Sequence, residues 1–180
     1  MEIEDRELVK RVLAGQTDDF RLLVNRHQPA IFRFASGMLR NREEAQDATQ
    51  ETFLAAFANL SGYDSSRAAF KTWLFTIARN RCINLLKKSR PVALDKPEMV
   101  RSDASTDPIS RQELYEQLNR ALAALPVDQR SAFVLAEIEE LPYAEIARIE
   151  QTSLGTVKSR IHRAKQRLQS LLEPVIRESK

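Results

Sequence analysis

The residues best suited to chemistry lie near the C-terminal end of the chain, where positive and hydrogen-bonding side chains alternate with apolar ones. At about 100° per residue, one side of this run is an apolar stripe made of Leu154, Val157, Ile161, Ala164, Leu168 and Leu171. The opposite side and its flanks carry Gly155, Thr156, Lys158, Ser159, Arg160, His162, Arg163, Lys165 and Gln166. Such side chains can donate hydrogen bonds to base edges and phosphates, which suits a nucleic-acid groove. The stripe alone is equally compatible with an amphipathic helix whose basic face is only solvated.

A short helix and a tight turn are predicted to position this basic helix. Pro142 stands at or near the first position of a helix over residues 141–147, where proline is favoured. Thr152 and Ser153 offer an N-cap for the basic helix, whose first backbone N–H groups can also hold a phosphate. The pattern predicts a helix-turn-helix in which the second helix reads DNA.

A second helix with nucleic-acid chemistry is predicted over residues 70–89. Residues 67–90 contain seven positive and no negative side chains. One face, within about 60° of the tryptophan, combines an aromatic ring, two amides and two cations. It consists of Trp73, Ile77, Asn80, Asn84, Lys87 and Lys88. Aromatic rings stack on unpaired bases and cations hold phosphates, so this face suits unpaired DNA. Trp73 can equally be a wedge between this helix and its neighbours.

An acidic helix is predicted to follow Asn41, which can cap it together with Glu44 at the third helical position. The predicted core face contains Ala45, Thr49, Thr52, Phe53, Ala56, Phe57 and Leu60. The other face collects Glu43, Glu44, Asp47, Gln50, Glu51 and Leu54. Taken alone, an acidic face with an outward leucine can be ordinary solvated surface.

The remaining patterns are also helical. Helices are predicted over residues 4–14, 18–26, 29–41, 110–125 and 128–139, the third of them starting at Pro29. Residues 91–109 contain three prolines and no periodicity, and are predicted to form a flexible linker. The chain is therefore predicted to be all-α, with two helical domains joined by this linker.

The composition argues against several classes of function. The chain has 180 residues, 43% of them apolar, which allows one or two domains with buried cores. Cys82 is the only cysteine, and His27 and His162 are the only histidines, so we expect neither a disulfide framework nor a metal site. Because there is no glycine-rich phosphate loop and no nucleophile-elbow sequence, we expect no cofactor and no enzyme. No uncharged apolar run reaches about eighteen residues, so we expect no membrane contact by the chain itself.

The net charge of +3 hides a strong segregation of charge along the chain. The successive net charges are +2 in residues 1–42, −5 in 43–66, +7 in 67–90, −5 in 91–140 and +4 in 141–180. Two basic blocks separated by acidic ones indicate two nucleic-acid contacts and an acidic surface for another partner.

Three stretches resemble one protein family. Residues 154–164, with the core Gly155-Thr156-Val157-Lys158-Ser159-Arg160, resemble the C-terminal helix-turn-helix of bacterial extracytoplasmic-function sigma factors of RNA polymerase, in particular the RpoE-like group. Residues 47–53 resemble the family's Asp-x-x-Gln-Glu-x-Phe motif. Residues 70–80 resemble the part of the family that melts and reads the −10 element. Together the motifs cover most of the chain, in the family's order.

The resemblance implies a domain plan and three sets of site residues. A sigma region 2 domain would occupy residues 1–90, a linker 91–109, and a sigma region 4 helix-turn-helix domain 110–180. The residues that dock on the β′ clamp coiled coil of core polymerase would be Asp47, Gln50, Glu51 and Leu54. The −10 DNA would be bound by Trp73, Arg79, Asn80, Asn84, Lys87 and Lys88. The −35 DNA would be bound by Thr156, Lys158, Ser159, Arg160, His162 and Arg163.

Four positions depart from the family's pattern. Asn84 stands where aspartate is common, and Gln151 stands where glycine is frequent. Glu150 and Ser153 occupy positions where an apolar residue and proline are common. The departure at Asn84 concerns which −10 bases are preferred. The departures at Glu150, Gln151 and Ser153 concern the geometry of the turn.

The resemblance implies a sigma factor that binds core RNA polymerase, recognises the −35 and −10 elements of promoters and assists DNA melting, without chemistry of its own. Its implied partners are core polymerase, promoter DNA and an anti-sigma factor, with no cofactor. The implied location is the bacterial cytoplasm, where the anti-sigma factor can hold the chain at the inner membrane. The alternatives are a stand-alone helix-turn-helix regulator on a two-fold operator, and a helical enzyme acting on nucleic acid, for which no acid/base or metal cluster is visible.

Overall fold

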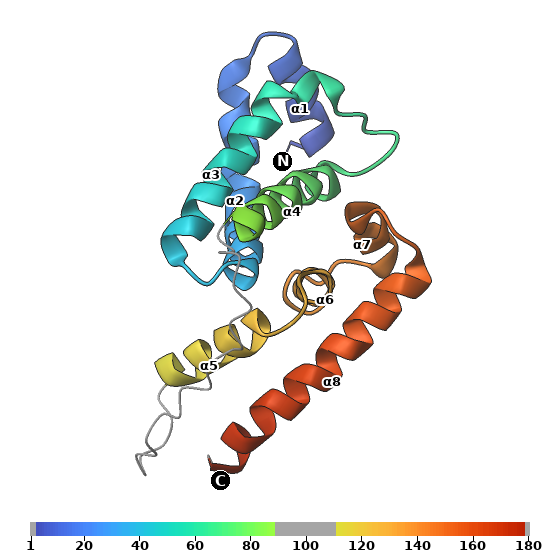
Figure 1. Cartoon of the computed structure of the whole chain (residues 1–180). Helices are drawn as coiled ribbons and strands as arrows, with labels where there is room; N and C mark the ends of the chain where they lie inside the picture. Colours follow the sequence, from blue (N-terminus) through green and yellow to red (C-terminus); the bar gives the residue numbers. More distant parts are fainter. Residues whose placement is uncertain (1–2, 89–110, 179–180) are drawn as a thin grey trace.

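The computed structural model describes residues 3–88 and 111–178, and every regular element in these ranges is helical (Figure 1). The α-helices are α1 (Asp5–Leu13), α2 (Phe20–Met38), α3 (Arg42–Ala58), α4 (Phe70–Lys88), α5 (Arg111–Ala123), α6 (Val127–Phe133), α7 (Tyr143–Glu150) and α8 (Leu154–Glu178). Short 3₁₀ turns span Thr17–Asp19 and Leu60–Gly62, and a π-helical turn, Val134–Ile138, continues α6. The predicted all-α class with two helical domains is confirmed. The predicted linker, residues 91–109, lies outside the described residues.

Helices α1 to α4 form the N-terminal domain, in which α2 packs on both α3 and α4. The core includes the fully buried side chains of Leu23 and Phe34 from α2. Helix α1 is tied to α2 by the carboxylate of Asp5, which lies 2.7 Å from Nε2 of His27 and accepts a hydrogen bond from Arg26. These hydrogen bonds hold the pKa of Asp5 below its usual value, although burial by itself raises it.

Pro29 does not begin a new helix. It lies inside α2, which runs from Phe20 to Met38, so the predicted break before residue 29 is wrong. Proline removes the hydrogen bond to the carbonyl four residues earlier. Here both Pro29 and Asn25 are exposed, so water can satisfy that carbonyl. Burial of Leu23 and Phe34 on one shared face outweighs the local preference of proline.

Helix α3 begins as predicted. The side-chain oxygen of Asn41 accepts a hydrogen bond from the backbone N–H of Glu43 at 2.8 Å. The buried residues of α3 are Ala45, Ala48, Thr49, Thr52, Phe53 and Ala56. Phe57 was predicted to be in the core but is 45% exposed. It lies in the last turn of α3, where it contacts the ring of Phe20 edge-to-face at 5.0 Å between centroids.

Helices α5 to α8 form the C-terminal domain and contain the predicted helix-turn-helix in α7 and α8 (Figure 1). Pro142 directly precedes α7, and Gln151 ends it in the left-handed conformation with a φ of 50°. Ser153 caps α8, since its hydroxyl oxygen accepts a hydrogen bond from the backbone N–H of Thr156 at 3.1 Å.

The apolar stripe of α8 is shorter than predicted. Its buried members are Val157, Ile161, Ala164 and Leu168. Leu154 and Leu171 are 44% and 46% exposed. Leu154 is the first residue of α8, and Leu171 lies in its C-terminal half. The periodic pattern predicts burial only if neighbouring helices cover α8 along its whole length, and they leave these two positions exposed.

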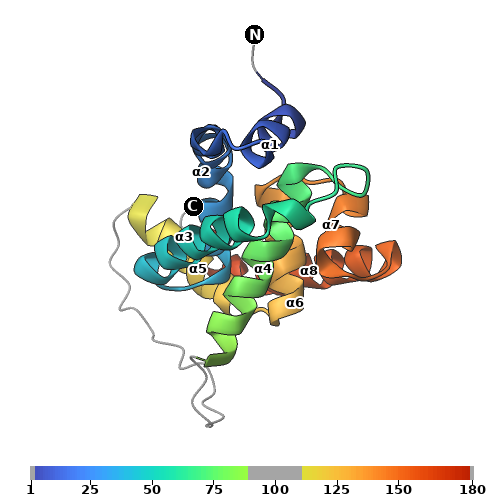
Figure 2. The same cartoon turned by 90° about the horizontal axis from the view of Figure 1, so that it is seen from above.

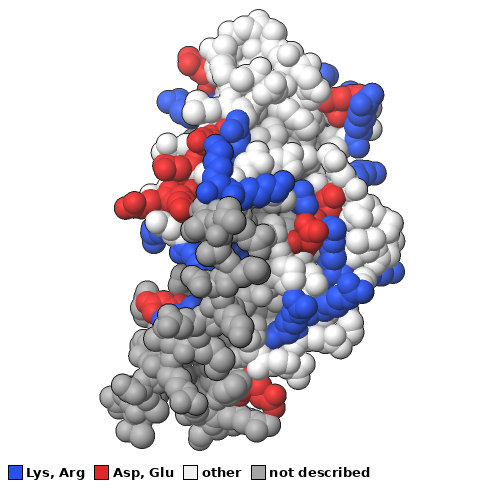
Figure 3. Space-filling view, in the orientation of Figure 1, with Lys and Arg blue, Asp and Glu red and all other residues white. Residues whose placement is uncertain are grey.

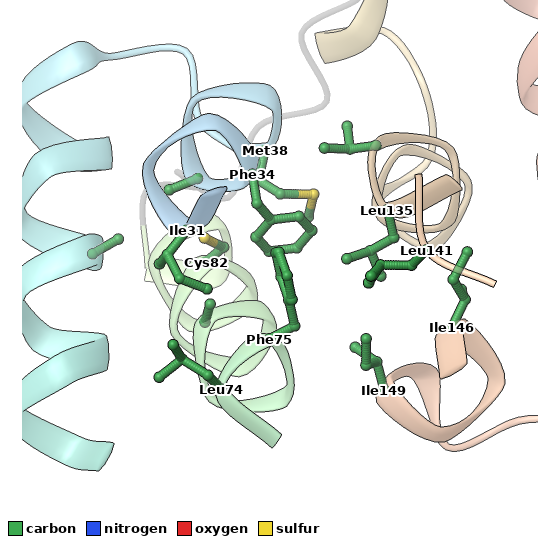
Figure 4. Close-up of a cluster of buried hydrophobic side chains, with 14 of the residues drawn as sticks. Ile31, Phe34, Met38, Leu74, Phe75, Cys82, Leu135, Leu141, Ile146 and Ile149 are labelled. Atoms are coloured by element: carbon green, nitrogen blue, oxygen red, sulfur yellow. The ribbon is translucent and has the colours of Figure 1, made fainter. Parts of the chain in front are cut away.

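The two domains pack against each other through apolar side chains. Seen from above, α4 lies over α6 and beside α7 (Figure 2). Figure 4 shows the facing side chains of this seam, among them Phe34, Met38 and Phe75 on one side and Leu135, Leu141, Ile146 and Ile149 on the other. All of them are buried. A continuous core therefore runs from one domain into the other.

Candidate nucleic-acid interface

The basic side of α8 faces solvent over its first turns. Lys158, His162 and Arg163 are exposed, and Thr156 and Ser159 are half-buried. Figure 3 shows the lysine and arginine side chains along the α8 side of the molecule. Because the Ser153 cap fixes the start of the helix, these donors project from a rigid element. The geometry suits insertion of α8 into a major groove.

A pocket lies between α3 and α4 on the face predicted to bind −10 DNA. Its volume is about 230 Å³, and it is lined by Ala55, Asn59, Trp73, Ile77, Asn80, Arg81 and Asn84. Four of the six residues that the sequence grouped on this face therefore meet in one pocket. The other two, Lys87 and Lys88, are exposed at the end of α4. An aromatic ring, three amides and a guanidinium around an open pocket can bind an unpaired base and its phosphate.

Trp73 has a structural contact as well as a place in the pocket. Its ring lies 5.2 Å from that of Tyr63 and 5.7 Å from that of Phe70, measured between centroids. Tyr63 donates a hydrogen bond to the carbonyl of Ala68 at 3.0 Å, which holds the loop before α4. The packing fixes the orientation of the Trp73 ring, so the wedge and the base-binding interpretation are compatible.

The outer face of α3 is acidic and exposed. Its residues, all open to solvent, are Glu43, Glu44, Asp47, Gln50, Glu51 and Leu54. Leu54 is 70% exposed, and Glu51 lies 3.6 Å from Arg81. In Figure 3 the acidic side chains gather on the side of the molecule where α3 lies. A large apolar side chain among carboxylates suits a protein partner with a basic and apolar surface.

Among the residues that the structure describes, no group of His, Cys, Asp and Glu could hold a metal ion. Within the same residues, no helix is long and apolar enough to cross a membrane.

Comparison with known proteins identifies the family. Sigma-70 region 2 matches residues 23–91, and Sigma-70, region 4 matches residues 115–168. The RNA polymerase sigma-H factor of Pseudomonas aeruginosa is 34% identical over 189 residues, covering 98% of this chain and 97% of that protein. The ECF RNA polymerase sigma factor SigW of Bacillus subtilis is 31% identical over 185 residues, covering 96% of this chain and 98% of that protein. The chain belongs to the extracytoplasmic-function sigma factors.

The fold of this sigma factor is also similar to that of a solved sigma factor structure. The sigma factor RpoE of Bartonella quintana, in complex with the anti-sigma factor NepR, aligns with a TM-score of 0.67 and 28% identity. The alignment covers 86% of this chain and 97% of that one.

Membership establishes the general function. The sigma factor binds core RNA polymerase and directs promoter-specific transcription initiation through the −35 and −10 elements. Sigma factors are not an enzyme family. The stand-alone regulator is not favoured, because the chain carries region 2 as well as region 4.

A charged network joins the two domains of the sigma factor. The carboxylate of Glu150 accepts two hydrogen bonds from Arg79, at 2.8 and 3.1 Å, and one from Arg160 at 2.8 Å. The hydroxyl of Ser131 donates a further one. Asp128 lies 3.6 Å from Arg79 and 3.1 Å from Arg160. Arg79, predicted to bind −10 DNA, and Arg160, predicted to bind −35 DNA, thus share the same two carboxylates.

Further polar contacts cross the same boundary. Arg33 of α2 donates two hydrogen bonds to Glu139, at 3.0 and 2.8 Å. Arg130 donates to the backbone carbonyl of Met38 at 2.7 Å. Burial, together with the charge of Arg40, lowers the pKa of Arg130 to about 10, so its guanidinium remains charged at neutral pH.

Sequence reasoning missed three residues of the pocket, Ala55, Asn59 and Arg81. Ala55 belongs to α3. Asn59 belongs to the end of α3 and reaches the pocket only because α3 packs on α4. Arg81 follows Asn80 on α4, but was not among the residues predicted to bind DNA. The positive charge of residues 67–90 was the one available signal for Arg81.

Proposed function

We propose that this sigma factor uses three surfaces. The exposed face of α3, with Asp47, Gln50, Glu51 and Leu54, docks on the β′ clamp coiled coil of core polymerase. The pocket of α4, with Trp73, Asn80 and Asn84, captures unpaired −10 bases while Arg79, Lys87 and Lys88 hold phosphates. The basic side of α8 reads the −35 element through Thr156, Lys158, Ser159, Arg160, His162 and Arg163.

The observation that carries this proposal is the pocket between α3 and α4. It combines a ring held by Tyr63 and Phe70 with the amides of Asn59, Asn80 and Asn84. Aromatic stacking holds a base that has left the duplex, and amides can hydrogen-bond its edge. A binding site for unpaired bases favours the melted promoter, which is what a melting factor requires.

The sigma factor performs no chemistry in this proposal. Its binding energy comes from phosphate neutralisation, contacts to base edges and capture of unpaired bases. The domain plan that goes with it is a region 2 domain at residues 1–90 and a region 4 domain at residues 110–180, with the linker at 91–109 between them. The match to Sigma-70 region 2 ends at residue 91 and the match to region 4 begins at residue 115, which supports these boundaries.

An anti-sigma factor is the proposed controlling partner. The similar RpoE of Bartonella quintana forms a complex with the anti-sigma factor NepR, and this supports an analogous partner here. We place the sigma factor in the bacterial cytoplasm, where such a partner can hold it at the inner membrane.

Reconstituted transcription with core polymerase and a promoter library tests the function as a whole. The expected result is initiation only when the sigma factor is added, at promoters that share a −35 and a −10 sequence. Equal initiation by core polymerase alone would refute it. Tight binding of the free chain to a two-fold site, with no effect on initiation, would instead support the stand-alone regulator.

A further inference from the structure

We infer that helix α1 contributes to the proposed −10 site, because Asp5 and His27 are positioning residues for the ring of Trp73. Contacts run without a gap from Asp5 in α1 through His27 in α2 to Phe70 and Trp73 in α4. These four residues form a contact path. The inference deepens the proposed function, and it rests on that function for the role of Trp73 in binding an unpaired base.

The carboxylate of Asp5, at the start of α1, is held by two side chains of α2. One of its oxygens lies 2.7 Å from Nε2 of His27, and the other accepts a hydrogen bond from Arg26. Arg26 also donates to the backbone carbonyl of Ile3 at 2.9 Å. Because both oxygens of the carboxylate are engaged, the plane of the His27 imidazole is fixed relative to α1.

The imidazole of His27 packs against the first residue of α4. His27 is 7% exposed, and its ring centroid lies 5.5 Å from that of Phe70 at an interplanar angle of 52°. Phe70 is itself 2% exposed. Rings attract each other in such tilted arrangements, and a close-packed interior leaves a buried ring few orientations. The hydrogen bond between Asp5 and His27 therefore restricts the orientation of Phe70.

Phe70 contacts Trp73 both directly and through Tyr63. The Phe70 ring lies 5.7 Å from that of Trp73 and 5.5 Å from that of Tyr63, measured between centroids. Tyr63 in turn lies 5.2 Å from Trp73. Asp5 acts on the same cluster of rings, because burial raises the pKa of Tyr63 and the negative charge of Asp5 raises it further. The phenol stays protonated and keeps its hydrogen bond to the carbonyl of Ala68.

The contact path ends at the residue of the pocket that can stack on a base. Trp73 is the only aromatic residue among those that line the pocket. A ring that is already oriented binds a base more tightly, because ordering a mobile side chain on binding costs conformational entropy. If Asp5 and His27 only stabilised the fold, their variants would unfold at a lower temperature but keep the native Trp73 ring and −10 affinity while folded.

Two variants of the full-length chain break the contact path at different links. Asp5→Ala removes the carboxylate, whereas His27→Gln keeps a nitrogen donor for Asp5 but removes the ring that contacts Phe70. Two controls in α1 match them. Glu7→Ala removes an exposed carboxylate from the same first turn, and Val12→Ala removes buried apolar surface. Thermal unfolding of each variant identifies a temperature at which all of them are folded, and the readouts below are taken there.

The first readout is the spectrum of Trp73 in the free chain, which reports this ring alone because the chain has no other tryptophan. We expect Asp5→Ala and His27→Gln to lose part of the near-ultraviolet circular dichroism of the indole and to shift its emission to the red, since a mobile ring has lost its fixed packing. Glu7→Ala and Val12→Ala should keep the wild-type spectra. A wild-type spectrum in either Asp5→Ala or His27→Gln would overturn the inference.

The double variant of Asp5→Ala with His27→Gln tests whether the two residues act in series. Once the ring at residue 27 is gone, Asp5 has no route to Phe70, so the double variant should change the Trp73 spectrum no more than His27→Gln does alone. Additive changes would show that Asp5 and His27 act on Trp73 independently, which contradicts the contact path.

The third readout is binding of reconstituted holoenzyme to a labelled single-stranded non-template −10 oligonucleotide of a promoter obtained from the library. We expect Asp5→Ala and His27→Gln to bind it about fivefold more weakly than wild type, which corresponds to the lower end of what stacking of one base contributes. Binding to duplex −35 DNA should remain at the wild-type level. Altered Trp73 spectra with wild-type affinity for the oligonucleotide would refute the inference.

Trp73→Ala distinguishes failure of the contact path from failure of the proposed function. If its holoenzyme binds the oligonucleotide as tightly as wild type, the pocket is not the −10 site and the inference is refuted together with the proposed function. If Trp73→Ala binds weakly while Asp5→Ala and His27→Gln bind normally, the contact path alone is refuted and the pocket stands.

Discussion

The guanidinium of Arg79 lies across the carboxylate of Glu150, with Nε 2.8 Å from Oε1 and Nη2 3.1 Å from Oε2. The two residues come from different domains, and the family resemblance predicts an apolar residue at the position of Glu150. A buried carboxylate at this position is stable because Arg160 and Ser131 complete its hydrogen bonds. The departure in sequence thus corresponds to a specific ion network at the domain boundary.

Replacing Glu150 with glutamine should lower the free energy of unfolding. The change keeps the shape of the side chain but leaves Arg79 and Arg160 without their buried counter-charge, which costs about 3 kcal/mol. Urea unfolding of the full-length chain measures the loss. Asp128→Asn is the control: its side chain is 54% exposed although it contacts the same two arginines, so its loss should stay below about 1 kcal/mol. Equal losses for the two variants would mean that burial of Glu150 adds nothing to the network.

The sequence was sufficient for most of the helices and for the sides that residues share on α3 and α4. Periodicity grouped Trp73, Asn80 and Asn84 on one face, because helical geometry alone determines which residues of α4 share a side. The same rule grouped Asp47 and Leu54 on the exposed face of α3.

The tertiary contacts could not be predicted in this way. The break at Pro29 was predicted from local preference, but burial along the whole of α2 outweighs the missing hydrogen bond. The exposure of Leu171 depends on where the neighbouring helices end. The partner of Glu150 lies 71 residues away in the chain, and no local pattern reports a contact at that distance.

Gln151 offers a test of the turn in the helix-turn-helix. Its φ of 50° is a left-handed conformation that costs most residues energy but not glycine. Gln151→Gly should therefore raise the free energy of unfolding by about 0.5 to 1 kcal/mol, whereas Gln151→Val should lower it by more than about 1 kcal/mol. Thermal unfolding of both variants measures the difference. An unchanged stability in both would indicate a turn that relaxes to ordinary φ values in solution.

Charge reversal on α3 should abolish binding of core polymerase. Asp47→Lys and Glu51→Lys place a positive charge on the face proposed to meet the β′ clamp coiled coil, while exposure keeps the effect on stability within about 0.5 kcal/mol. Co-purification with core enzyme is the measurement. Glu7→Lys, on the exposed side of α1, is the matched control and should bind normally. Wild-type recovery of core enzyme with Asp47→Lys would remove α3 as the docking surface.

The pocket between α3 and α4, which we propose binds −10 bases, should matter most on promoters that start as duplex DNA. Asn80→Ala and Lys87→Ala should slow formation of the open complex, because Asn80 lines the pocket and Lys87 lies exposed beyond it on α4. A template with a pre-melted −10 bubble should restore activity, more fully for a residue that assists melting than for one that reads a base. Lys10→Ala, an exposed residue of α1, is the control. The same defect on duplex and bubble templates would mean that the two residues bind DNA without helping it to melt.

The exposed arginines of α8 should separate base reading from phosphate binding. Arg163 is exposed in the part of α8 that we propose enters a groove, and Arg167 lies one turn further along. Arg163→Ala should cost about 1 to 3 kcal/mol at the preferred −35 element and relax the preference at one or two positions. Arg167→Ala should weaken binding about equally on all sequences and reduce the salt dependence by about one phosphate contact.

Arg160 should differ from both, because it already contacts Glu150 and Asp128. Arg160→Ala should reduce stability as well as −35 preference, whereas Arg163→Ala should leave stability within about 0.5 kcal/mol of wild type. Holoenzyme binding to a −35 library at several salt concentrations, combined with urea unfolding, distinguishes the three arginines. If Arg163→Ala lowers affinity uniformly with no change in base preference, this side of α8 is a phosphate clamp and the −35 bases must be read by other residues.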